Sequence, residues 1–138
     1  MGEDLKYNGA QRREYLTMID RIGANWIAVF EGDKEFYSSA YWDLLTQLWR
    51  RDGPVRKTEA LGYMQAIKSA HTAGKYVQDA LDHNLIEEAD NPEDARSKLV
   101  ALTPRMRERL DRFFDTAVGE LRIANRQIDI KGPSPEDP

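Results

Sequence analysis

Hydrogen-bond donors of several kinds occur close together between residues 69 and 78. A helix is predicted over residues 70–83, with Ser69 as its N-cap, because a serine side chain can accept from the unpaired N–H groups of a first turn. Its apolar positions, turned inward, leave one outward face, formed by Ala70, His71, Gly74, Lys75 and Gln78. An ammonium group can neutralise a phosphate, and a carboxamide can pair bidentately with adenine. This face therefore has the chemistry to contact nucleic acid, and the alternative is an ordinary solvated helix face.

Two of these outward positions allow a second interpretation. Gly74 weakens a helix by about 1 kcal/mol relative to alanine. Its missing side chain either permits a close approach of another backbone or is a tolerated defect. His71 either donates to a phosphate or base, or is an unremarkable surface histidine.

Basic residues also cluster on both sides of this helix. Arg56 and Lys57 precede it and are predicted to contact phosphates, which position a protein on DNA without specifying a sequence. Arg96 and Lys98 follow it, beside the turn-forming residues 90–94. A narrow minor groove favours an inserted arginine, which fits Arg96. The alternative for Arg96 is an ion pair with Asp94 or Glu93, and for the other basic residues it is a solvated surface.

Few residues are suited to catalysis or to metal binding. The chain has no cysteine, which excludes disulfides and thiolate chemistry. Its two histidines, His71 and His83, are twelve positions apart, which is not a metal-ligand spacing. No glycine-rich phosphate loop or nucleophile motif is present. We therefore predict no enzymatic activity, no metal site and no cofactor.

Length and composition predict one soluble globular domain. The chain has 138 residues, with 32% charged residues and a net charge of −4. The mean hydropathy is −0.70, and no apolar stretch reaches the roughly 18 residues of a membrane span. The N-terminus lacks the apolar core of a signal peptide, so we expect a cytoplasmic protein with no membrane partner.

The predicted elements are mainly helical, with a small β-hairpin. Apolar residues at three- and four-residue steps predict helices from near Gln11 to Phe30 and over 39–51, 57–67, 70–83 and 104–130. Short strands are predicted at 85–88 and 97–102, around a five-residue turn. Short helices followed by a hairpin indicate a winged helix-turn-helix. We expect a flexible N-terminus (1–10), one winged-helix domain (11–131) and a disordered tail (132–138).

Two segments resemble the MarR-type transcriptional regulators. DNPEDARSKLVALTP, residues 90–104, is similar to that family's wing, and SAHTAGKYVQDALDHNLIEE, residues 69–88, to its recognition helix. The resemblance implies that Ser69, Thr72 and Lys75 contact DNA and that Arg96 belongs to the wing. The sequence departs from the family in four places. The glycine that often follows the Leu-Thr of the wing is absent, and Met106 is nearby instead. Asn84 replaces a glycine, Asp79 replaces a late basic residue, and the stretch before Thr72 is longer.

The terminal helices are longer than one such domain needs. Their apolar stripes, Tyr15–Phe30 and Phe113–Ile128, suit the interleaved helices of a second subunit. We predict a homodimer, with 11–35 and 104–131 as dimerisation helices and 39–103 as a DNA-binding lobe, reading a pseudo-palindromic double-stranded site. The resemblance also implies a small aromatic effector near four aromatic residues, which otherwise belong to the core: Trp26, Phe30, Tyr41 and Trp42. The competing function is a winged-helix protein-interaction module that does not bind DNA.

Overall fold

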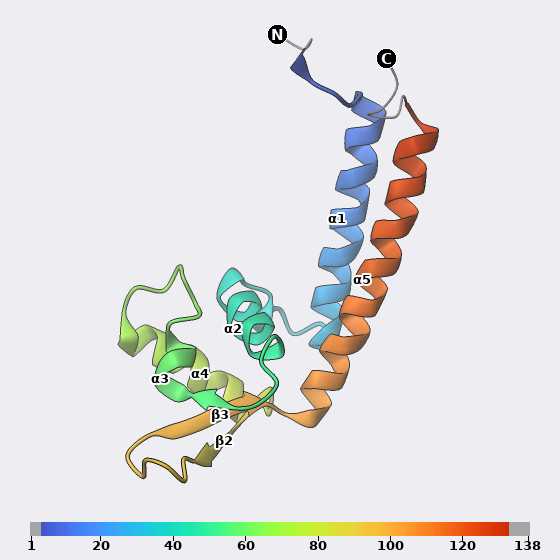
Figure 1. The fold of residues 1–138 in the computed structure, drawn as a ribbon. Helices are drawn as coiled ribbons and strands as arrows, with labels where there is room; N and C mark the ends of the chain where they lie inside the picture. The colour runs from blue at the N-terminus through green and yellow to red at the C-terminus, as the bar shows by residue number, and fades with distance from the viewer. Residues whose placement is uncertain (1–3, 133–138) are drawn as a thin grey trace. The chain divides into compact units, whose positions relative to one another are not determined.

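The computed structural model describes residues 4–132 as a mostly helical chain with one small antiparallel sheet (Figure 1). The chain forms two compact units. Within the described residues, the first unit comprises 4–32 and 112–132, and the second comprises 33–111. Most of the predicted tail, residues 133–138, lies outside the described residues, as do residues 1–3. No helix in the described part of the chain is long and apolar enough to cross a membrane.

The first unit pairs helix α1, Gly9–Val29, with the later part of α5, which runs Pro104–Ile130 (Figure 1). Helix α1 begins two residues earlier than predicted, because Asn8 caps it. The Asn8 side chain accepts from the Gln11 backbone, and the Gln11 side chain accepts from the Asn8 backbone. This reciprocal capping box satisfies two otherwise unpaired donors.

A polar connection joins the start of α1 to the end of α5. Gln11 is only 2% exposed, and its Nε2 donates to the Ile128 carbonyl at 2.8 Å. Asn8 Nδ2 donates to the Lys131 carbonyl at 3.1 Å. A Cβ added to Gly132 would lie 2.4 Å from Asn8 Nδ2, so a side chain there would disturb these bonds.

Apolar packing continues along the same pair of helices. Trp26 meets Phe30 and Phe113 edge to face, with ring centroids 5.0 and 5.3 Å apart. Such arrangements are favoured by the quadrupoles of aromatic rings. Of the predicted stripe on α1, Met18 and Trp26 are buried, whereas Tyr15 and Ile19 are exposed.

The second unit contains the short helices and the sheet. After a short 3-10 helix, Lys34–Phe36, the elements in chain order are α2 (Ser39–Trp49), β1 (Val55–Arg56), α3 (Lys57–Leu61), α4 (Ala70–Asp82), β2 (Ile86–Asp90) and β3 (Lys98–Leu102). Strand β3 lies in the middle of the sheet, antiparallel to both neighbours. Ile86 pairs with Leu102, and Val55 pairs with Val100. The two-stranded wing that we predicted is therefore part of a three-stranded sheet.

Three predicted boundaries in this unit were wrong. Strand β1 was missed, because its two residues are too few to show an alternating pattern; its register comes from pairing with β3. Helix α3 ends at Leu61 instead of residue 67, because Gly62, a poor helix former, is its C-cap. Met64 lies in the loop after the helix, and its side chain is buried. Strand β2 continues to Asp90, so the wing turn begins one residue later.

The core of the second unit holds α4 against α2 and the sheet. Fully buried side chains from these elements include Leu44, Leu45, Val77, Ile86 and Val100. Asn84 adopts φ 60°, the left-handed conformation predicted for the residue that leaves α4. Thr103 Oγ1 accepts from the Met106 N–H at 3.2 Å, which caps α5 as predicted.

Candidate nucleic-acid interface

Helix α4 separates its buried and exposed residues as the sequence predicted. Ala73, Val77 and Ala80 are buried. The exposed side chains are Ala70, His71, Thr72, Lys75 and Gln78. Ser69 Oγ accepts from the Thr72 N–H at 3.3 Å and caps the helix. The α4 N-terminus thus presents hydroxyl, imidazole and ammonium groups beside backbone donors, where the helix dipole favours an anion.

Gln78 is already engaged within its own helix. Its Nε2 donates to Asp82 Oδ1 at 2.9 Å, one turn further along α4. Pairing of this carboxamide with a base therefore requires the bond to Asp82 to open. Asp79 and Asp82 also make this end of α4 acidic, in contrast to the end that carries Lys75.

Gly74 is not required by packing within the chain. A Cβ built on it meets nothing within 4 Å, and it lies in the middle of α4. A tolerated defect and a close approach to an external backbone both fit this geometry.

Replacing Gly74 by alanine distinguishes these two roles. We expect Gly74→Ala to raise the free energy of unfolding by about 1 kcal/mol, because alanine is the better helix former. We expect DNA affinity to fall roughly tenfold, about 1.4 kcal/mol, because the methyl group would enter the space needed for the groove wall. Urea denaturation and fluorescence anisotropy measure the two effects.

Gly119→Ala is the matched control. Gly119 lies in α5 with equally open space around its Cβ, so the substitution should raise the free energy of unfolding by a similar amount. Unchanged DNA affinity in Gly74→Ala, together with the same gain in stability, would assign Gly74 to a tolerated defect.

The wing loop, residues 91–97, joins β2 to β3 (Figure 1). Hydrogen bonds of its own side chains hold it. Asn91 is buried; its Oδ1 accepts from the Glu93 N–H, and its Nδ2 donates to Ser97 Oγ, both at 3.0 Å. Asp94 Oδ1 accepts from the Arg96 N–H at 3.0 Å. Side-chain bonds of this kind fix a turn without a hydrophobic core.

The Arg96 side chain projects from this loop and is 96% exposed. Its Nε lies 3.8 Å from Asp94 Oδ1, a loose surface pair of the kind that contributes little to stability. The loop conformation therefore depends on the Arg96 backbone and not on its guanidinium group.

Lys98 and Lys57 differ from Arg96, whose ion pair is loose, because each lysine forms a close ion pair. Lys98 Nζ contacts the Asp90 carboxylate across the β2–β3 ladder, which raises the pKa of Lys98 and lowers that of Asp90. Lys57 Nζ lies 2.7 Å from Glu88 Oε2 and joins the start of α3 to β2. Contact of either lysine with phosphate would compete with these carboxylates.

Arg56 ends β1 and is exposed. It lines a shallow groove, together with Arg51 and Glu59, against the wing residues Pro92 and Glu93. The groove shows that the residues before α3 lie next to the wing. Arg56, Arg96 and α4 all belong to the second unit.

The four aromatic residues of the predicted effector site are divided between the two units. Trp26 and Phe30 are buried in the first unit. Tyr41 is buried in the second, where its hydroxyl donates to the Tyr76 carbonyl at 3.0 Å and burial raises its pKa well above the usual range. Trp42 is exposed. Three of the four thus have core positions, and their binding of an effector stays a prediction.

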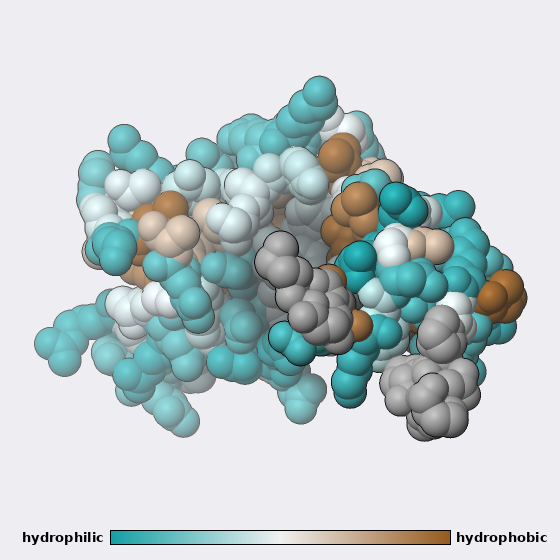
Figure 2. Space-filling view, turned by 90° about the horizontal axis from the view of Figure 1, so that it is seen from above, coloured by the Kyte–Doolittle hydropathy of each residue, from teal (hydrophilic) through white to brown (hydrophobic). Residues whose placement is uncertain are grey.

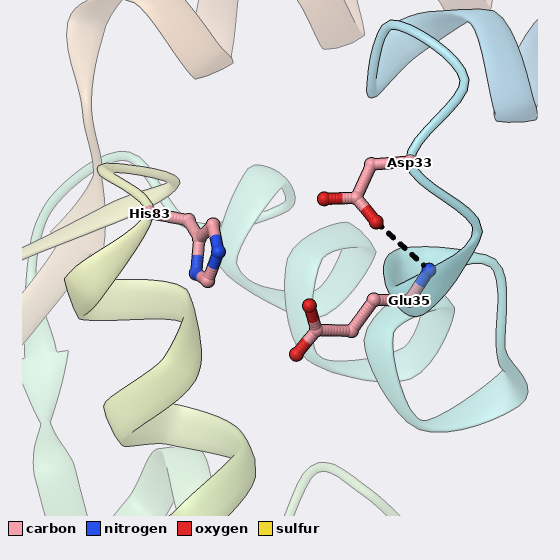
Figure 3. A group of neighbouring side chains, drawn as sticks. All are labelled: Asp33, Glu35 and His83. Atoms are coloured by element: carbon pink, nitrogen blue, oxygen red, sulfur yellow. Dashed lines mark hydrogen bonds between the residues drawn. The ribbon is translucent and has the colours of Figure 1, made fainter.

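One group of polar side chains was not predicted from the sequence. Asp33, Glu35 and His83 lie together in the second unit (Figure 3), with one potential ligand atom from each within 4.8 Å of the others. The hydrogen bond to the Asp79 carbonyl, and then the nearby Glu35 and Asp33 charges, raise the pKa of His83. Sequence spacing cannot reveal this group, because about fifty residues separate Glu35 from His83 and only the fold brings them together.

Solved structures with the same fold support the predicted architecture. A probable transcriptional regulator from Pseudomonas aeruginosa is 24% identical, with a TM-score of 0.50 over 83% of this chain and 78% of that one. A protein from Bacillus cereus described as a MarR-like transcription regulator is 17% identical, with a TM-score of 0.52 over 80% and 76%. No family model and no curated protein matches the sequence.

Proposed function

We propose that this chain, whose fold is the winged helix of the MarR-like regulators, is a homodimeric transcription regulator that binds double-stranded DNA in a sequence-specific manner. The exposed N-terminal face of α4 carries the proposal, because its polar side chains are displayed with no role in the core. A helix of this kind fits the major groove, where base edges can be read. No catalytic role is proposed for any residue.

The wing supports the same function. Arg96 is displayed on a loop whose shape is set by other groups, which suits insertion into a minor groove at little further cost in ordering. Arg56 supplies a phosphate contact beside it, while Lys57 and Lys98 would first leave their carboxylate partners. The descriptions of the two solved structures as transcription regulators add support from outside the chain.

Exposed apolar residues on the α1–α5 pair support a dimer. In Figure 2, which looks onto the free ends of this pair, hydrophobic surface lies among the hydrophilic residues. The large apolar side chains exposed on the two helices are Tyr15, Leu16, Ile19, Val118, Leu121, Ile123 and Ile130. Large apolar side chains exposed in this number on one helix pair suit burial against a second subunit. A symmetric dimer would place two α4 helices on half-sites about one turn of DNA apart.

The second candidate function is a protein-interaction module without DNA binding. The net charge of −4, the acidic end of α4 and the two paired lysines favour it. The affinity for DNA depends steeply on salt concentration, because binding releases counterions from phosphates. Protein binding does not release counterions in this way.

The test is fluorescence anisotropy with DNA from the promoter region of the protein's own gene, against scrambled competitor, over a salt series. Sequence-specific binding that weakens as salt rises supports the regulator. Absence of binding at low salt, with the dimer intact, supports the interaction module. A small aromatic effector remains a further prediction, which thermal melting with a panel of phenolic acids would test.

A further inference from the structure

The group formed by Asp33, Glu35 and His83 lies away from the proposed DNA-binding side chains of α4. Asp33 and Glu35 come from the segment around the 3-10 helix, whereas His83 is the C-cap residue of α4. All three are exposed, and one donor atom from each lies within 4.8 Å of the others. In Figure 3 the two carboxylates and the imidazole point toward one another.

The orientation of the imidazole is fixed from outside the group. His83 Nδ1 lies 2.8 Å from the Asp79 carbonyl oxygen, which can only accept, so Nδ1 carries the proton. The Phe36 ring meets the imidazole edge to face, with centroids 4.9 Å apart. Nε2 is then the nitrogen with a free lone pair. A histidine whose other nitrogen donates to a backbone carbonyl is the usual form of a metal-binding histidine.

The local charges also favour a cation. Two carboxylates face the imidazole, and the carbonyl end of α4 carries the negative end of the helix dipole. Asp33 additionally accepts from the Glu35 N–H at 3.1 Å, which leaves it a second carboxylate oxygen.

We propose that Asp33, Glu35 and His83 bind one divalent transition-metal ion of the Zn²⁺ type, with water as the remaining ligand. An imidazole nitrogen selects such ions over Mg²⁺ and Ca²⁺, which prefer all-oxygen sites. Bonds of about 2.0–2.2 Å require the three donors to draw closer than they lie here. Exposed side chains can do this by changing rotamer.

Bound metal would join the segment before α2 to the end of the helix that we propose reads DNA. Both partners belong to the second unit, so the ion would restrict motion within that unit. Binding of the metal itself does not depend on the proposed DNA-binding function, and its test needs no DNA.

The test is a Zn²⁺ titration of the tag-free protein followed by NMR of the histidine rings. The chain has two histidines, so His71 is an internal control. We expect the His83 signals to change until one equivalent has been added, those of His71 to stay constant, and Mg²⁺ to have no effect. Calorimetry should show binding weakened at least about tenfold in His83→Ala and in the double variant Asp33→Asn, Glu35→Gln. His71→Ala should bind Zn²⁺ with the affinity of the wild type.

The double variant is expected to fold like the wild type. Asparagine at position 33 can still accept a hydrogen bond from the backbone N–H of residue 35, and glutamine has nearly the same shape as glutamate. Equal changes at both histidines would overturn the proposal. So would wild-type affinity in His83→Ala or in the double variant, since the ion would then bind elsewhere.

Discussion

Replacing both Lys75 and Arg96 by alanine is expected to reduce operator affinity by roughly 1.5 to 4 orders of magnitude. Each side chain is exposed and stands on a different element, α4 or the wing loop. A contact to a base edge or a desolvated phosphate contributes about 1–3 kcal/mol, and two separate contacts add. Neither substitution removes a buried contact, so the free energy of unfolding should change by less than about 0.5 kcal/mol.

The single variants distinguish the two kinds of contact. If Lys75 meets a phosphate, Lys75→Ala should lower the dependence of log affinity on log salt by about 0.9 and weaken all sequences alike. If it meets a base edge, the loss should be confined to the specific site. Arg13→Ala, which removes the same charge from the exposed side of α1, is the control and should leave operator affinity unchanged. Wild-type affinity in the double variant would refute the proposed interface.

A charge placed on the exposed apolar residues of α5 is expected to separate the proposed dimer. Leu121 is 54% exposed in the isolated chain, and Val118 lies one turn before it. Burying the new carboxylate of Leu121→Glu without a partner would cost several kcal/mol. Light scattering should then give a mass near the 15.9 kDa of one chain in place of twice that value.

Loss of the dimer should also weaken operator binding. A monomer engages one half-site, and removal of the linked second half-site costs about 10² to 10⁴ in affinity. Gln65→Glu adds the same charge at an exposed position in the second unit, outside the α1–α5 pair, and should leave the mass unchanged. A mass of 15.9 kDa for the wild-type protein, measured by light scattering at micromolar concentration, would by itself refute the dimer.

The parts of the fold that were predicted correctly are those with strong local signals. Thr103 and Pro104 mark the start of α5, Ser69 marks the start of α4, and Asn84 marks the left-handed residue after it. Each signal depends on backbone chemistry within one turn, so neighbouring residues suffice to show it.

The parts that were missed depend on distant partners. Strand β1 exists through its pairing with β3, and Gln11 is buried because the Ile128 carbonyl lies opposite. The predicted DNA-binding face could be derived from helical spacing alone, but the pairs that Lys57 and Lys98 make with Glu88 and Asp90 could not. Periodicity identifies which side of a helix is exposed. It does not identify which charged groups another element brings to it.

The construction of the wing loop has an evolutionary consequence. Asn91 and Asp94 set its backbone through bonds to main-chain N–H groups and to Ser97, and Arg96 participates through its own N–H. A different side chain at position 96 could form the same backbone bond. With Arg96 in contact with DNA as proposed, mutations there would change the preferred target while the protein stays folded. In related chains we expect residue 96 to diversify and residues 91 and 94 to stay constant.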